Sequence, residues 1–302
     1  MKNLVFLSTA IFLFFSASGQ VIKVDSTTHW KKYIKVGLNI NQASFSSNWT
    51  AGGTNSIGAV AVVHWVTKYK KDKTSWDNDV DLGYGYVNNE GQGFRKTLDR
   101  FYLDTKFGHE LSKKWSTYAS LNFLSQFSKG FKYEDDVNGV EQELLISDIM
   151  APAFITASFG FEYHPVEYFK VRISPLSPRA TIVNDAQRFV TTVGSMPYGV
   201  DPNDNGRFEW YAFQLTADFK KDIAKNLNLK FRYLLFANYE TFEAKTIDQR
   251  LELKLSAKVN NFIDVNLGGV LLYDIDQDSG LQYNQFFTLG FVYSFQNYED
   301  KK

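Results

Sequence analysis

The stretch that most constrains the fold is the last apolar run of the chain, residues 281–295. Its aromatic and aliphatic side chains share one parity, namely Tyr283, Phe287, Leu289, Phe291, Tyr293 and Phe295. Small or polar side chains take the other parity, namely Asn284, Thr288, Gly290 and Ser294, with Phe286 and Val292 as exceptions. A period of two over about 14 residues predicts a strand rather than a helix. Globular strands average about 5–6 residues, so this length favours a strand that crosses a membrane and closes a barrel against the first strand.

The same alternation recurs in about twelve runs, an even number that is typical of bacterial single-chain barrels. These runs are residues 33–45, 56–70, 76–88, 98–110, 115–131, 149–163, 169–183, 207–220, 227–241, 246–259, 262–274 and 281–295. Runs of about 13–15 residues exceed the roughly 9–11 that cross a bilayer. A soluble sandwich would use shorter strands and enclose its apolar face. We therefore expect an all-β fold, a transmembrane antiparallel up-and-down β-barrel over residues 33–295.

The connections between these runs alternate in length. The short set is residues 71–75, 111–114, 164–168, 221–226 and 260–261. The mostly longer set is residues 46–55, 89–97, 132–148, 184–206, 242–245 and 275–280. Aromatic residues gather near both sets, as expected of two interfacial girdles. This asymmetry predicts short periplasmic turns, longer extracellular loops and both termini in the periplasm.

Residues 1–19 have the features of a signal peptide: a basic start, an apolar core over residues 4–15, and the small residues Ala17 and Gly19. The core is shorter than the roughly 20 residues of a membrane-spanning helix. The chain has no cysteine, which excludes disulfides and a lipid anchor at the cleavage site. We expect export by a cleaved signal peptide to the outer membrane of a Gram-negative bacterium. Residues 20–32 would form a periplasmic lead-in and residues 296–302 a periplasmic tail.

Charged residues of both signs occupy the parity that would face the lumen. The expected lumen charge network comprises Asp77, Asp79, Asp81, Arg100, Asp104, Lys106, Arg172, Arg207, Lys230, Arg232, Arg250, Glu252 and Lys254. A selective pore would favour one sign, whereas a mixed set favours a paired network that fills and stiffens a small barrel. Twelve strands enclose less space than a porin of about 16–18 strands. We therefore expect a narrow or loop-gated path rather than a wide channel.

Two kinds of loop are candidate sites. The loop 46–55 holds Trp49, Gly52 and Gly53, which would fold into the barrel mouth, dock a partner or form an ordinary surface loop. Two acidic loops carry oxygen ligands at alternate positions, the pattern of a calcium loop, namely Asp201, Asn203 and Asn205, and Asp274, Asp276 and Asp278. The bidentate glutamate at the twelfth position is missing, since Ala212 and Gln285 stand there. The alternative is the turn chemistry of Asp, Asn and Gly in hydrophilic loops.

No arrangement of residues in the sequence points to catalysis. The four histidines, His29, His64, His109 and His164, are not at metal-ligand spacing, and no serine–histidine pair is evident. We therefore expect no enzymatic activity and no cofactor apart from calcium, with an outer-membrane lipid hydrolase or acyltransferase as the alternative. The formal net charge is zero, with 33 basic and 33 acidic residues, which argues against a nucleic-acid partner.

Several short motifs occur in order along the chain. They are residues 48–53 (NWTAGG), 95–100 (RKTLDR), 125–127 (SQF), 130–131 (GF), 146–147 (IS), 151–153 (APA), 174–176 (SPL) and 198–200 (YGV). With these motifs the mature chain resembles an uncharacterised outer-membrane β-barrel family of the Bacteroidetes, a domain of unknown function. The resemblance implies a Gram-negative outer membrane and carries over no catalytic or ligand residues. Residues 296–302 depart from the terminal aromatic residue with which such barrels usually end.

Taken together, these features predict a non-enzymatic barrel with outer-membrane lipid around it. Its leading function is that of a narrow or gated pore, or of an accessory subunit bound to a protein of an envelope complex. The alternative is a surface binding module that uses loops 46–55 and 184–206. A membrane-embedded lipid-modifying enzyme is the second alternative.

Overall fold

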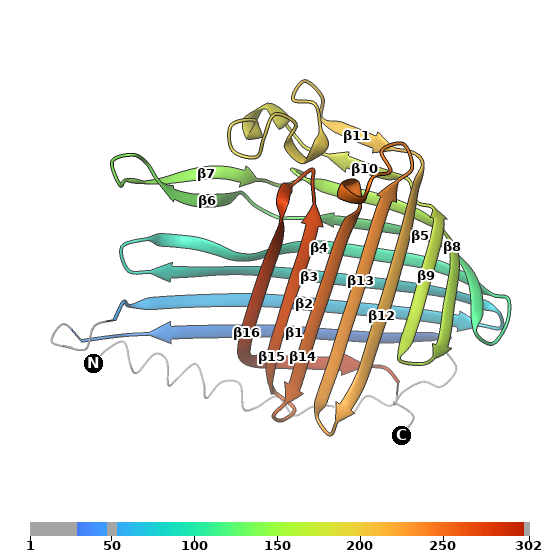
Figure 1. Cartoon of the computed structure of the whole chain (residues 1–302). Coiled ribbons are helices and arrows are strands. Elements are labelled where there is room, and N and C mark those ends of the chain that lie inside the picture. The colour runs from blue at the N-terminus through green and yellow to red at the C-terminus, as the bar shows by residue number, and fades with distance from the viewer. Residues whose placement is uncertain (1–28, 47–52, 299–302) are drawn as a thin grey trace.

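The computed structural model describes residues 29–46 and 53–298, and within them twelve strands form a closed antiparallel ring. In ring order these are β1 (Trp30–Ala43), β2 (Ser56–Lys71), β3 (Thr74–Asn89), β4 (Gly93–Glu110), β5 (Trp115–Ser125), β8 (Ala153–Val166), β9 (Phe169–Leu176), β12 (Ala212–Ala224), β13 (Leu227–Asn238), β14 (Asp248–Lys258), β15 (Ile263–Asp274) and β16 (Asp278–Gln296). Figure 1 shows the orange to red strands β12–β15 crossing the blue to green strands β1–β5 at a steep angle. The predicted fold class, an antiparallel barrel of about twelve strands, is confirmed.

The last strand closes the ring, as its length and pattern predicted. β16 pairs with β1 from Tyr33 opposite Gln296 to Leu38 opposite Phe291. The same strand pairs with β15 on its other side. Neither the first nor the last strand of the ring therefore leaves an unpaired edge along this stretch.

The barrel wall is apolar on the outside and polar on the inside. Phe287 and Phe291 on β16 are 70% and 62% exposed, and Leu253 in the middle of β14 is 50% exposed. In contrast, Lys106 and Arg172 on the other face of the wall are only 4% and 9% exposed. In water, such an apolar belt would cost about 25 cal/mol for each Å² left exposed. The arrangement is the reverse of a soluble protein and matches a barrel surrounded by hydrocarbon.

Three of the predicted strands are interrupted at the long-loop end. The run 115–131 ends as β5 at Ser125, and its last two residues begin β6 (Gly130–Asp135), which is not part of the wall. The other two runs are each divided in two. The run 169–183 forms β9 and β10 (Arg179–Ile182), and the run 207–220 forms β11 (Gly206–Glu209) and β12. The break between β9 and β10 falls at Ser177 and Pro178, and Pro178 has no amide hydrogen for the ladder. The wall stays paired across it, because the Ser177 amide donates to the Ala212 carbonyl at 2.8 Å.

Several expected boundaries were wrong, mostly at the long-loop end. The expected loop 89–97 is largely strand, since β3 and β4 continue to a turn at residues 90–92. The expected loop 132–148 contains a two-stranded sheet of β6 (Gly130–Asp135) and β7 (Glu141–Ser147), which projects from the barrel (Figure 1). Strands beyond the bilayer meet water on both faces, so their sequences show no alternation to reveal them. At the other end, β1 begins at Trp30, within the expected lead-in.

The connection from β10 to β11, residues 183–205, folds into a compact unit that we call the mouth loop. It contains the 3₁₀ turns η2 (Ala186–Phe189) and η3 (Pro197–Gly199). Val183, Phe189 and Val200 in this loop are fully buried around Ala151. A further 3₁₀ turn, η4 (Ala244–Thr246), lies between β13 and β14. None of the helices in the described ranges is long and apolar enough to span a bilayer.

Candidate functional site

Strand register brings opposite charges side by side on the inner wall. Asp77 on β3 stands opposite Lys106 on β4, and Glu162 on β8 stands opposite Arg172 on β9. Their side chains point inward because each occupies the parity opposite to the exposed apolar residues of its strand. The sequence-predicted lumen residues on the barrel strands all share this inner face, whereas Arg207 lies on β11 near the mouth.

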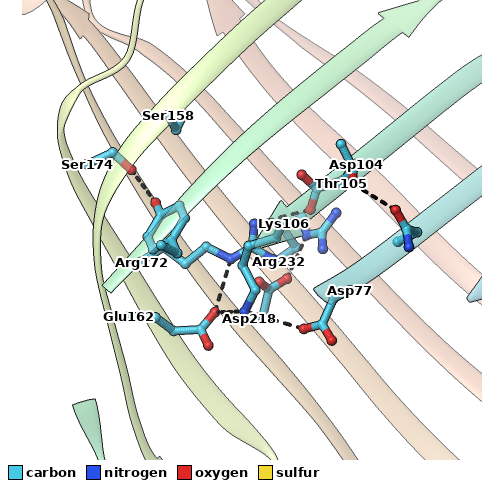
Figure 2. A network of polar contacts seen from close by, with 12 residues as sticks. Asp77, Asp104, Thr105, Lys106, Ser158, Glu162, Arg172, Ser174, Asp218 and Arg232 are labelled. Atoms are coloured by element: carbon cyan, nitrogen blue, oxygen red, sulfur yellow. Dashed lines mark hydrogen bonds and ion pairs between the residues drawn. The ribbon is translucent and has the colours of Figure 1, made fainter. Parts of the chain in front are cut away.

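The most buried part of the lumen is an ion network around Glu162. Its carboxylate lies 2.6 Å from Lys106 Nζ and 3.3 Å from Arg172 Nε (Figure 2). Arg172 also donates from Nη1 to Asp104 Oδ2 at 3.1 Å, and Lys106 Nζ lies 3.4 Å from Asp77. Each buried charge therefore has at least one partner of opposite sign, which offsets the cost of removing it from water.

Nearer the long-loop end than this network, side chains from opposite walls meet across the lumen. Arg232 on β13 donates to the Tyr102 hydroxyl on β4 at 3.2 Å. Arg100 on β4 lies 3.4 Å from Glu252 on β14. Since β4 is on the far side of the ring from β13 and β14, these contacts close the barrel interior at this level. We call Arg100, Tyr102, Arg232 and Glu252 the constriction.

Two small cavities flank the constriction, with volumes of about 30 and 60 Å³. Both are lined by Tyr102, Asn122, Arg232 and Leu234. A buried water needs roughly 10–15 Å³ of such space, so each cavity has room for a few water molecules. Tyr102 and Arg232 line both cavities, whereas Arg100 and Glu252 line only the second.

The mouth loop reaches from β7 on one side to the β15–β16 turn on the other. The Tyr198 hydroxyl donates to the Ile146 carbonyl on β7. Arg207 donates to the Gly199 carbonyl at 3.2 Å and to Asp276 Oδ2, in the β15–β16 turn, at 2.6 Å. Burial raises the pKa of Tyr198 to about 12, so the hydroxyl keeps its proton and remains a donor. These contacts hold the loop over the long-loop end of the barrel.

We expect Arg207→Ala to loosen the mouth loop. Arg207 is about one-third exposed, so solvent screening limits the loss to roughly 1 kcal/mol. Hydrogen exchange of amides in residues 184–205 should then speed up about fivefold. Lys245→Ala is the matched control, because its exposed ion pair with Glu243 lies on a neighbouring loop. Equal acceleration in both variants would show that Arg207 does not hold the loop.

The structure places only part of the first candidate loop. Trp49 and Gly52 lie outside the described residues. Gly53 has φ 144°, and a Cβ at this position would overlap the ring of Phe45. A side chain is thus excluded at Gly53 by both conformation and space.

The first calcium candidate is organised by its own turn. Asp201 Oδ1 accepts from the backbone amide and the side-chain amide of Asn203, at 2.9 and 3.0 Å. Asn205 Oδ1 accepts from the Asp185 amide at 3.2 Å. The Asp201 contacts are those of an Asx turn, the alternative that the sequence left open, whereas the Asn205 contact joins the two ends of the mouth loop.

The second calcium candidate is engaged in turn and ion-pair contacts. Asp274 Oδ1 accepts from the Asp276 amide at 3.0 Å, while Asp276 binds Arg207. Asp278 Oδ1 accepts from the Gly280 amide at 2.7 Å. Across residues 29–46 and 53–298, no group of three or more acidic or histidine side chains is gathered as a metal site.

Two central residues were absent from the predicted network, Glu162 and Tyr102. Glu162 shares the inner parity of β8 with Ser158 and Gly160, so the alternation of that strand would have revealed it. Tyr102 lies between Arg100 and Asp104 on β4 and shares their parity. The alternation of β8 and β4 therefore carries the signal for both residues.

The comparisons with known proteins concern the fold. A family model described as "Protein of unknown function (DUF3078)" matches residues 40–131. No curated protein matches the chain. Among solved structures, an outer membrane channel from Pseudomonas putida F1 matches with 9% identity and a TM-score of 0.41, over 91% of this chain and 98% of that chain. The NanC porin matches with 8% identity and a TM-score of 0.38, over 86% of this chain and 98% of that chain. At these identities the similarity is one of barrel fold alone.

Proposed function

We propose that the protein is an outer-membrane β-barrel of a Gram-negative bacterium that forms a narrow, gated pore. Residues 1–19 direct its export and are then removed. The short turns face the periplasm, and the mouth loop faces the outside. Lipid is its surrounding partner. The observation that carries the proposal is the constriction, where charged side chains from opposite walls meet beside water-sized cavities.

The polar character of the closure favours a pore over a filled structural core. Arg100 also approaches Asp81 at 3.5 Å, and Glu252 also binds Arg250 at 2.7 Å, so each charge has a second partner on its own side of the barrel. Rotation of either side chain would therefore break the contact across the lumen without leaving a charge unpaired. An apolar plug would offer no such exchange of partners.

Current recording across planar bilayers tests the pore directly. We expect brief openings of small conductance from the mature protein. Steady openings on the order of hundreds of picosiemens would contradict the constriction, because they require a lumen like that of a larger barrel. A complete absence of current would instead favour the accessory-subunit alternative.

The apolar belt gives a separate prediction about membrane embedding. Leu253→Arg should destabilise the barrel in phospholipid vesicles by about 2–4 kcal/mol, since an arginine near the bilayer midplane must leave water. Leu281→Arg, on an exposed residue at the long-loop end, should cost about 0–1 kcal/mol. Equilibrium urea unfolding measures both. Equal costs at the two positions would contradict the depth that we assign to Leu253.

A second candidate function is that of an accessory subunit. It is favoured by the β6–β7 hairpin, which forms its own two-stranded sheet outside the barrel and exposes Val137 fully at its tip. Co-purification from detergent-solubilised outer membrane distinguishes the candidates. A stoichiometric partner that is lost on deletion of residues 131–146 would support this function.

We also propose that the protein works without catalysis. His64, whose Nε2 lies 3.0 Å from Asp79 Oδ1, has an ion-pair partner rather than a nucleophile. Four buried hydroxyls bond in pairs: Ser177 donates to Ser158 at 3.2 Å, and Ser174 is bonded to Tyr118. None of these serines bonds to a histidine in the described part of the chain. Phospholipid hydrolysis that disappears on substitution of a single serine would overturn this proposal.

A further inference from the structure

One level of the inner wall carries a row of like charges. Lys220 on β12 stands directly opposite Lys230 on β13, which stands directly opposite Lys254 on β14. We call these three residues the lysine row. Like charges directly opposite on neighbouring strands destabilise a sheet. The row therefore needs a physical reason.

The next lumen-facing positions along the same three strands, one step toward the constriction, show the usual alternation of opposite charges. There Asp218, Arg232 and Glu252 alternate in sign, and Asp218 Oδ1 lies 2.6 Å from Arg232 Nε. Strand register and inward parity are identical at the two levels. The lysine row thus differs from the adjacent set of Asp218, Arg232 and Glu252 in the signs of its charges and not in its strand pairing.

The lysine row has no counter-ion of its own. Lys220, Lys230 and Lys254 form no ion pair or side-chain hydrogen bond among the residues that the structure describes. Three carboxylates that attract the row have cationic or imidazole partners of their own: Asp79 has His64 at 3.0 Å, Asp264 has Lys35 at 2.5 Å, and Asp81 has Arg100 at 3.5 Å. Positive charge is therefore in excess at this level.

The opposite wall adds to this excess. Lys220 interacts electrostatically with Lys230 and also with Lys68 on β2, and Lys254 interacts with Lys35 and Lys230. Carboxylates oppose this repulsion: Asp79 and Asp222 attract Lys220, and Asp81 and Asp264 attract Lys254, while Lys68 stands directly opposite Asp77. Lysines thus face this level of the lumen from two sides.

Water reaches this level from the short-turn end. Lys220 and Lys68 are exposed, and Lys230 and Lys254 are half-buried. Each lies three or four residues from the end of its strand. Flexible lysine stems can turn their ammonium groups toward a common anion, which would remove the mutual repulsion.

We propose that the lysine row and Lys68 form a binding site for a small multivalent oxyanion of the phosphate class in the periplasmic half of the lumen. The site itself stands on the geometry of the inner wall. Its role in permeation, as the selectivity site for an anionic solute, rests on the proposed pore. The constriction above the site then separates the anion from the outer mouth.

Isothermal titration of the mature protein in detergent tests the site, with inorganic phosphate as the probe and chloride of equal ionic strength as the reference. We expect saturable binding of phosphate but not of chloride. Lys230→Gln should weaken the phosphate affinity about tenfold, because it removes the central charge of the row. Lys70→Gln is the matched control, since Lys70 lies at the same end of the barrel and is paired with Glu110 at 2.5 Å.

A stability measurement separates a binding role from a structural one. Without phosphate, Lys230→Gln should raise the urea midpoint, because it relieves repulsion; with phosphate, the wild-type protein should gain more stability than the variant. Equal effects of phosphate and chloride, or unchanged binding in Lys230→Gln, would overturn the site. Phosphate binding without any bilayer current would leave the site standing and contradict the pore.

Discussion

The double variant Arg100→Ala/Tyr102→Ala should conduct ions in long openings, with a single-channel conductance about tenfold above that of the wild-type protein. The two substitutions remove the Arg100–Glu252 contact and the hydroxyl that accepts from Arg232. They also remove the ring that lines both cavities, so that these spaces join. Arg232 keeps Asp218 and Glu252 keeps Arg250, and the carboxylate that loses Arg100, Asp81, is 39% exposed and therefore stays hydrated.

Lys245→Ala serves as the control in the same bilayers, because this exposed residue lies far from the constriction on the loop before β14. Its conductance should equal that of the wild-type protein. A double variant that folds normally and remains as closed as the wild type would show that the constriction does not limit the current.

The second large effect is expected at the buried ion network. Glu162→Gln keeps the size of the side chain but removes the charge that Lys106 and Arg172 share at 2.6 and 3.3 Å. Breaking a buried pair by removing one partner costs about 3–5 kcal/mol. Lys106 and Arg172 keep Asp77 and Asp104 as partners, so we expect the lower end, about 3 kcal/mol, in equilibrium urea unfolding.

The control for this prediction is Glu141→Gln on the β6–β7 hairpin. Glu141 also pairs with an arginine, Arg95, but is 43% exposed. A solvent-exposed pair contributes about 0–1 kcal/mol. Equal losses for Glu162→Gln and Glu141→Gln would mean that burial does not determine the strength of the network.

The wall of the barrel was predictable because two solvents act on it. Lipid on one side and polar side chains on the other impose a period of two on every strand, as at Phe287 and Thr288. The closing pair of β16 with β1 followed from the same reasoning. Even the exceptions fit, since Phe286 faces the lumen and packs over Gly268, where a Cβ would overlap its ring.

The contacts inside the lumen could not be predicted from alternation. Parity places Arg100 and Glu252 on the inner face, but they are separated by 152 positions in the chain. The tilt and stagger of the strands decide which residues of opposite walls meet, and the alternation within a single strand predicts neither quantity. For the same reason, the lysine row emerged only when register set Lys220, Lys230 and Lys254 side by side.

The mouth loop and the β6–β7 hairpin could not be predicted from hydrophobic alternation, for a different reason. Outside the bilayer no second solvent enforces alternation, so the sequence signal of a strand disappears. Phe189 and Val200 become buried through contacts with one another and with Ala151, more than 30 residues before them in the chain. Such packing is visible only in three dimensions.

The most direct test of the central claim uses single cysteines, because the natural chain has none. In phospholipid vesicles, a fluorescent label on Thr288→Cys would lie on the inner face of the β16 wall, and a label on Leu289→Cys would lie on its outer face. We predict that a lipid-confined quencher reaches the label at Leu289→Cys, while a water-soluble quencher reaches the label at Thr288→Cys. Protection of the Leu289→Cys label from lipid, with access of water to it, would contradict a barrel whose apolar face meets hydrocarbon.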